Sequence, residues 1–181
     1  MSVHLGPTHV NQPSRWRQAS VPGAGSLIDS TSVQRPDIYM YRRRLPHWRL
    51  AGATYFVTWR LAVDQSELTA VERSLVADCL RHFDHKRHEL LAYVIMDDHV
   101  NALVTPLGDW ALEQVIHSWK SFSTYQLQRT CGRIGHVWQS EYFDRVIRDQ
   151  AELVEKATYI VHNPWKRWPD LLEYPWMGTC E

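Results

Sequence analysis

Two short apolar runs in the middle of the chain most restrict the fold that this sequence can adopt. They read LLAYVIMD (residues 90–97) and HVNALVTP (residues 99–106), and they meet at the pair Asp97-Asp98. Each run has the length of a strand and is too short to cross a membrane. Two acidic residues between such runs are typical of a tight turn. The sequence therefore predicts an antiparallel hairpin, which needs other elements to cover its apolar faces.

The segments that precede and follow this hairpin alternate between strand and helix patterns. Residues 54–61 are rich in β-branched and aromatic side chains, which favours a strand. Apolar side chains recur at helical spacing in 66–89, where the pair Ser66-Glu67 marks the expected start. The same spacing recurs in 109–132, which ends at a glycine. We therefore expect one helix before the hairpin and one after it.

The last third of the chain continues this alternation. Residues 136–149 have an extended pattern, and residues 150–163 have a helical one. We expect that helix to stop before Pro164, because a residue that precedes proline disfavours the helical conformation. The order strand, helix, strand, strand, helix, strand, helix predicts an α+β fold with helices packed against one antiparallel sheet.

Residues 1–37 differ from the rest of the chain. They are polar, lack hydrophobic periodicity and contain four prolines, at positions 7, 13, 22 and 36. Such a segment cannot bury enough apolar surface to offset the entropy of ordering. We expect a disordered leader over 1–37 and one folded domain over 38–181.

Composition excludes some classes of protein. The formal net charge is zero, so no global basic field indicates a nucleic-acid partner. Nine tryptophans provide core volume and flat stacking surfaces. Three cysteines without a CxxC pair argue against a zinc ribbon or a disulfide framework and fit a reducing compartment. We expect a cytoplasmic protein without a membrane span.

His99 and Asn101 stand two residues apart in the second run of the hairpin. Residues i and i+2 of a strand share a face, so the imidazole and the amide project together while Val100 points the other way. An imidazole nitrogen and an amide oxygen can bind a divalent ion, and these donors suit Mg²⁺ or Mn²⁺. A structural histidine beside a buried amide gives the same pattern, so the residues alone leave both interpretations open.

Tyr125 lies on the helix expected over 109–132 but away from its apolar stripe. At ~100° per residue it falls roughly 120° from the centre of that stripe, one turn from Arg129. A tyrosine hydroxyl has a pKa of about 10, so attack on a phosphodiester needs a metal-polarised phosphate or a nearby cation. A surface tyrosine of an amphipathic helix has the same position, and this alternative also stays open.

Five segments, taken together and in this order, resemble the REP-associated tyrosine transposases. These are single-domain HUH-type proteins related to the small insertion-sequence transposases. The resemblance runs from about Tyr39 to Trp176. The segments are YFVTWRLA, YVIMDDHVNALVTP, IHSWKSFSTYQLQR, GHVWQSEYFDRVIRD and YIVHNPWK.

This resemblance implies a ferredoxin-like fold whose central strand carries two metal-binding histidines on either side of a hydrophobic residue. It implies a metal-dependent transposase and endonuclease that nicks and rejoins single-stranded or hairpin DNA of palindromic repeat sequence. Cleavage would give a 5′-phosphotyrosine intermediate and a free 3′-hydroxyl. The implied cofactor is Mg²⁺ or Mn²⁺, and the implied partner is DNA.

The resemblance also assigns roles to particular residues. His99 matches the first histidine ligand, and Asn101 stands where the family has the second. Tyr125 is the only tyrosine on the helix expected to carry the nucleophile. The third ligand of the family lies about one turn past the tyrosine, where this chain has Gln128.

A second function stays open beside this one. Asparagine is a neutral and weaker ligand than histidine, and in another register the position of the nucleophile falls at Phe122 and that of the third ligand at Gln126. The alternative is a catalytically degraded DNA-binding protein of the same fold that recognises palindromic repeat DNA. Under either function we expect four cations to contact DNA phosphates. They are Lys120, Arg129, Arg145 and Arg148.

Removal of residues 1–37 should leave the domain folded, because this segment has few apolar side chains to contribute to a core. We expect a chain that begins at Ile38 to melt within a few degrees of the full-length protein in a circular dichroism scan. Loss of the cooperative transition in the shortened chain would show that the leader packs against the domain.

Overall fold

The predicted hairpin is present at the centre of the molecule. The computed structural model describes residues 38–42, 46–50 and 52–179. Strands β4 (His88–Ile95) and β5 (His99–Pro106) pair antiparallel along their length. The backbone N–H of Met96 donates to the carbonyl of His99 at 2.8 Å, which leaves Asp97 and Asp98 as the two turn residues.

Three further strands complete a five-stranded sheet of order β6-β3-β5-β4-β7, in which every pair of neighbours is antiparallel. They are β3 (Tyr55–Arg60), β6 (Phe143–Val146) and β7 (Met177–Thr179). The succession β3-α1-β4-β5-α2-β6 is the ferredoxin-like arrangement, so the predicted fold class is confirmed. Strands β1 (Ile38–Arg42) and β2 (Pro46–Leu50) form a separate antiparallel pair. Residues 1–37 lie outside the described residues, and the predicted leader stays a prediction.

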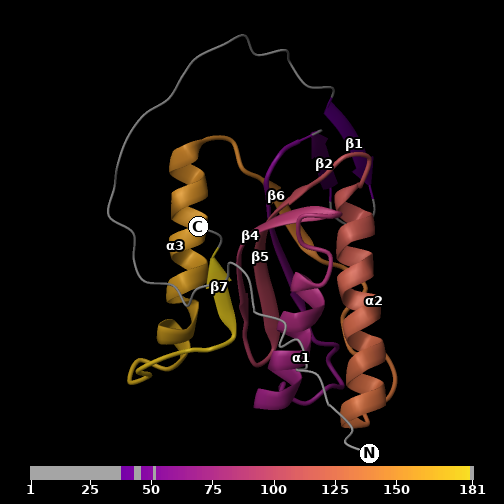
Figure 1. The fold of residues 1–181 in the computed structure, drawn as a ribbon, viewed down its shortest axis with the longest axis vertical. Helices are drawn as coiled ribbons and strands as arrows, with labels where there is room; N and C mark the ends of the chain where they lie inside the picture. Colours follow the sequence, from indigo (N-terminus) through magenta and orange to yellow (C-terminus); the bar gives the residue numbers. More distant parts are fainter. Residues whose placement is uncertain (1–37, 43–45, 51, 180–181) are drawn as a thin grey trace, which may run out of the picture.

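The three helices cover both faces of the sheet. Helices α1 (Ala70–Arg81) and α2 (Leu112–Cys131) lie on one side, and α3 (Gln150–Arg167) lies on the other (Figure 1). No helix within the described ranges is long and apolar enough to cross a membrane.

The side chains of β5 alternate between the two helical layers. Val100, Ala102 and Val104 belong to the core that includes Trp119 of α2. Leu103 belongs to the second core, with Ile160 of α3. Because successive strand residues point to opposite faces, the odd-numbered positions of β5 face α3.

Three helix boundaries differ from the sequence prediction. Helix α1 ends at Arg81 rather than continuing to residue 89, because the chain turns at His85, where φ is 59°, and enters β4 at His88. Helix α1 begins after Thr69 rather than at Ser66, because Thr69 and Glu72 form a capping box. The Thr69 hydroxyl accepts from the Glu72 backbone, and the Glu72 carboxylate accepts from the Thr69 backbone at 2.8 Å.

Helix α3 continues through Pro164 to Arg167, whereas we expected it to stop before the proline. Pro164 lies in the last turn, where its missing N–H removes one helical hydrogen bond and leaves those that follow intact. The helix ends instead at Trp168, whose backbone N–H donates to the Pro164 carbonyl at 2.8 Å.

A buried ion pair joins the end of α2 to the start of α1. Arg133 follows α2 and donates from Nε and Nη2 to the Glu72 carboxylate, and both side chains are less than a tenth exposed. The hydrogen bond from Arg133 is the main reason that the pKa of Glu72 falls from an ordinary 4.5 to about 2, although burial opposes the shift. Arg133 also donates to the carbonyls of Ser66 and Glu67, which orders the segment before α1.

The lowered pKa of Glu72 makes the stability of the fold depend on pH. The ion pair contributes fully above about pH 4.5 and loses its contribution as the pH falls toward about 2, because the unfolded chain then binds the extra proton. At ~1.4 kcal/mol per pKa unit, the wild-type free energy of unfolding should fall by about 2 kcal/mol between about pH 6 and about pH 3 from this group alone. Urea unfolding of Glu72→Gln should lack this part of the pH dependence. Glu173→Gln, which changes an exposed carboxylate, is the matched control and should keep the full pH dependence of the wild-type protein.

Candidate functional site

His99 and Asn101, called the donor pair below, lie on the face of the sheet that α3 covers. His99 is the first residue of β5, and Asn101 pairs in register with Thr58 of β3 and Val94 of β4. Leu103 continues the same face and packs in the α3 core. The two donors therefore share a face, as the alternation of the strand predicted.

The amide of Asn101 is buried and only half satisfied. Its side chain is 1% exposed, and its Oδ1 accepts from the Thr58 hydroxyl at 2.6 Å. Its Nδ2 has no hydrogen-bond partner among the described residues. A buried polar atom without a partner costs free energy, so this amide is suited to a further ligand. A half-turn of the amide would let Nδ2 bond Thr58 and would present Oδ1 to a cation.

The imidazole of His99 is held in one orientation. Its Nδ1 contacts Asp98 Oδ1 at 2.5 Å, and Arg60 Nη1 donates to Asp98 Oδ2 at 2.8 Å. Burial raises the pKa of Asp98, but the hydrogen bond and charge of His99, with the charges of Arg60 and Arg167, outweigh burial and lower it. An ionised carboxylate on Nδ1 keeps the proton there and leaves Nε2 as the nitrogen that can bind a metal.

Helix α3 runs across this face of the sheet. The ring of Tyr159 packs edge-on against Phe56 of β3, with 5.9 Å between the ring centroids. At the end of the helix, its last residue Arg167 pairs with Asp97 of the hairpin at 2.8 Å. Asn163 lies on α3 four residues from both Tyr159 and Arg167, and is 6% exposed. Asn163 therefore lies on α3 between the contact with Phe56 and the contact with Asp97, on the same face of the sheet as the donor pair.

The sequence reasoning missed Tyr159 and Asn163. The available signal was their i, i+4 spacing inside YIVHNP, which puts a tyrosine and an amide one turn apart on the same side of a helix. Tyr159 is 39% exposed, and Lys166 Nζ lies 4.2 Å from the centroid of its ring. An accessible hydroxyl, an amide and a cation therefore lie on α3 beside the donor pair.

Arg145 and Arg148 belong to the same side of the molecule. Both pair with Glu152 in the first turn of α3, while their own side chains are 45% and 71% exposed. The backbone N–H of Arg148, then its guanidinium, then that of Arg145 lower the pKa of Glu152 to about 2. These two predicted DNA contacts are therefore exposed cations held near the start of α3.

The other predicted residues lie on α2, on the opposite face of the sheet. Arg129 Nη1 donates to the Tyr125 hydroxyl at 3.2 Å, and Gln128 Nε2 donates to the Gly135 carbonyl at 2.9 Å. Lys120 Nζ donates to the carbonyls of Gln139 and Ser140 at 2.6 Å and 2.9 Å. Each of these α2 side chains is therefore hydrogen-bonded to α2 itself or to the segment that follows it.

The structure therefore does not bring the predicted set together within one chain. Tyr125 and Gln128 lie on the face of Val100, whereas the donor pair lies on the face of α3. The physical reason is the alternation of β5, which sends odd and even residues to different helical layers. The donor pair therefore does not form one site with Tyr125 and Gln128 within a single chain, and the roles predicted for these residues stay predictions.

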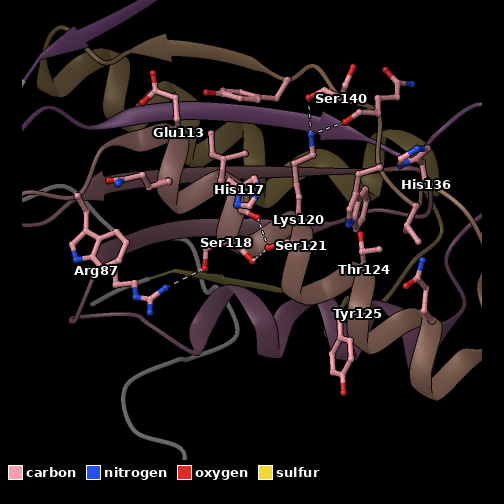
Figure 2. A pocket seen from close by; sticks show the side chains of 18 residues that line it. Arg87, Glu113, His117, Ser118, Lys120, Ser121, Thr124, Tyr125, His136 and Ser140 are labelled. Atoms are coloured by element: carbon pink, nitrogen blue, oxygen red, sulfur yellow. Dashed lines mark hydrogen bonds between the residues drawn. The ribbon is translucent and has the colours of Figure 1, made fainter.

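Three of these four α2 residues instead line a cavity of about 1000 Å³, called the α2 groove below (Figure 2). Tyr125, Gln128 and Lys120 are part of its lining, together with the loop of residues 136–140. The lining combines aromatic and aliphatic with polar side chains and contains no member of the donor pair.

The donors available for a metal ion are few. Within the described part of the chain, no group of three or more His, Cys, Asp or Glu side chains could hold a metal. The α3-facing site offers one imidazole nitrogen and the amides of Asn101 and Asn163. Amide oxygens and one imidazole fit a hard divalent cation such as Mn²⁺ or Mg²⁺, without the charge that would make binding tight.

Comparison with known proteins decides the family. Residues 55–163, more than half of the 181 residues, match the family described as IS200-like transposases. The chain belongs to the IS200-like transposase family. This IS200-like transposase is 25% identical over 128 residues to the REP-associated tyrosine transposase of Escherichia coli (strain K12), a match that covers 70% of the chain and 72% of the relative.

Two solved structures are similar to this IS200-like transposase. One is a REP-associated tyrosine transposase bound to a REP hairpin, with a TM-score of 0.57 and 24% identity over 71% of this chain and 73% of that one. The other is a putative transposase from Deinococcus radiodurans R1, with a TM-score of 0.45 and 16% identity over 72% and 95%. The similarity to the first of these structures supports the ferredoxin-like fold described above.

The family match includes both tyrosines of interest, Tyr125 and Tyr159, and so does not distinguish them. The two differ in position: Tyr159 is on the helix that covers the donor pair, and Tyr125 is on the helix behind the sheet. Of the two helices, α3 is therefore the one on the same side of the sheet as the donor pair.

Proposed function

We propose that this IS200-like transposase nicks and rejoins single-stranded or hairpin DNA at the site between β5 and α3. The observation that carries the proposal is the position of Tyr159 and Asn163, one turn apart on the helix that covers the donor pair. A relative of the same fold is described as bound to a REP hairpin, which supports hairpin DNA as the substrate.

The proposed reaction is attack by the Tyr159 hydroxyl on a DNA phosphate. The hydroxyl loses its proton as a bond forms between its oxygen and phosphorus, and the bond from phosphorus to the 3′ oxygen breaks. The products are a 5′-phosphotyrosine and a free 3′-hydroxyl, and the reverse reaction rejoins a strand. A bound Mg²⁺ or Mn²⁺ would polarise the scissile phosphate, with His99 Nε2 and the amide oxygens of Asn101 and Asn163 as its ligands.

The remaining residues of this face orient the reacting groups. Asp98 fixes the ring of His99, and Thr58 fixes one end of the Asn101 amide. The ammonium of Lys166, 4.2 Å from the centroid of the Tyr159 ring, puts a positive charge beside the proposed nucleophile and the phosphate it attacks. The exposed guanidiniums of Arg145 and Arg148 are available to DNA phosphates.

A DNA-binding protein with degraded chemistry is the second candidate. Asn101 favours it, because a neutral amide replaces the second histidine implied by the resemblance and lowers the affinity for metal. The same surfaces would then bind hairpin DNA without cleaving it. Formation of a covalent adduct separates the two functions.

Tyr159→Phe should abolish a covalent protein–DNA adduct formed with a hairpin oligonucleotide and Mn²⁺, because only the attacking oxygen is removed. Binding of the same oligonucleotide should change by less than about twofold, since the ring that packs on Phe56 remains. A denaturing gel measures the adduct, and fluorescence anisotropy measures binding.

Tyr125→Phe is the matched control, because it removes the same atom from the opposite face of the sheet. It should leave adduct formation at the wild-type level. If Tyr125→Phe abolishes the adduct and Tyr159→Phe does not, the nucleophile is Tyr125 and the proposed site is wrong. Absence of an adduct from the wild-type protein, with binding intact, would favour the binding protein.

Asn101→His should strengthen metal binding, because it adds a second imidazole on the same face as His99 and leaves Val100 in the opposite core. Calorimetry should show tighter binding of Mn²⁺, by roughly tenfold for a gain of ~1.4 kcal/mol. His99→Ala should remove Mn²⁺ binding in both backgrounds. Unchanged affinity in a folded Asn101→His protein would mean that the pair is structural.

A further inference from the structure

The α2 groove lies on the face of the sheet opposite the proposed cleavage site. One wall is the outer side of α2, and the other is the segment of residues 136–142. Its volume of about 1000 Å³ stands at the upper end of the ~300–1,000 Å³ that is usual for ligand pockets. It therefore has room for more than one nucleotide-sized group. Because neither His99 nor Asn101 lines the groove, the proposed cleavage site gives it no role.

One end of the groove presents a flat aromatic ring and a fixed cation. Trp110 is 37% exposed, and the guanidinium of Arg87 lies 4.5 Å from the centroid of its ring. The other neighbour of this guanidinium is Phe83, at 3.5 Å, and Arg87 Nη1 also donates to the Ser118 hydroxyl at 3.4 Å. The two rings and the hydroxyl hold the charge of Arg87 in place beside Trp110.

A second fixed cation lies further along the groove. Lys120 donates to two carbonyls of the facing loop, so its ammonium stays in the groove wall (Figure 2). His117 and His136 add imidazole donors to the lining, and Glu113 is the one carboxylate among the described residues that line it. Arg87 and Lys120 bring two permanent positive charges to the groove and Glu113 brings one negative charge. The groove therefore has a net positive charge, although the formal net charge of the chain is zero.

We propose that the α2 groove binds a short segment of single-stranded DNA, with a base stacked on Trp110 and phosphates near Arg87 and Lys120. Stacking of bases on aromatic rings beside a basic groove is the general mode of single-strand binding. The inference rests on the proposed DNA function and adds a second binding surface behind the sheet.

Fluorescence anisotropy with a labelled oligothymidylate of about eight nucleotides tests the groove, because this probe forms no hairpin. Trp110→Ala and Arg87→Gln should each weaken its binding about tenfold, and Trp110→Phe should lose less because a ring remains. Lys86→Gln is the matched control. It removes one exposed positive charge next to Arg87 but outside the groove, and affinity should stay within about twofold.

Equal affinity of Trp110→Ala, Arg87→Gln and the wild-type protein, with all melting cooperatively, would overturn the inference. A loss in Lys86→Gln as large as that in Arg87→Gln would also overturn it, because binding would then follow diffuse charge. The hairpin adduct assay reports separately on the cleavage site. If adduct formation fails while the groove variants still lose oligothymidylate affinity, the proposed function is wrong and the groove remains a single-strand site.

Discussion

The alternation of side chains along β5 is the constraint on which the rest of the structure depends. This strand is paired on both sides, with β3 and β4, and is covered on both faces by helices. A slip of one residue in its pairing would bury Asn101 in the α2 core and would turn Val100 toward α3. The hydrophobic residues at even positions fix the register, and this register in turn fixes the face on which the donor pair lies.

Much of the fold could be predicted from local sequence patterns. The turn at Asp97-Asp98 and the end of α2 at Gly132 both occur where turn and capping chemistry put them. The start of α1 was missed because its capping box outweighs the earlier polar residues, and the end of α3 was missed because a proline in a last turn costs little.

The candidate site was only partly predictable, for a different reason. Strand periodicity showed that His99 and Asn101 share a face, since a period of two depends on the strand alone. Helical periodicity shows which side of a helix is apolar, but it does not show which face of a sheet that helix covers. The choice between Tyr125 and Tyr159 depends on that tertiary arrangement, in which α2 and α3 lie on opposite sides (Figure 1).

The ion pairs at the two ends of α3 have a mechanical consequence. Glu152 in the first turn bonds Arg145 of β6, and Arg167 in the last turn bonds Asp97 of the hairpin. Because these ion pairs join α3 to the sheet at both ends, the helix can neither slide along the sheet nor rotate about one end without breaking a charged contact. Under the proposed function, Tyr159 would then adjust to a substrate by rotation about its own side-chain bonds. In the proposed reaction the phenol ring, rather than the helix, would then provide the motion.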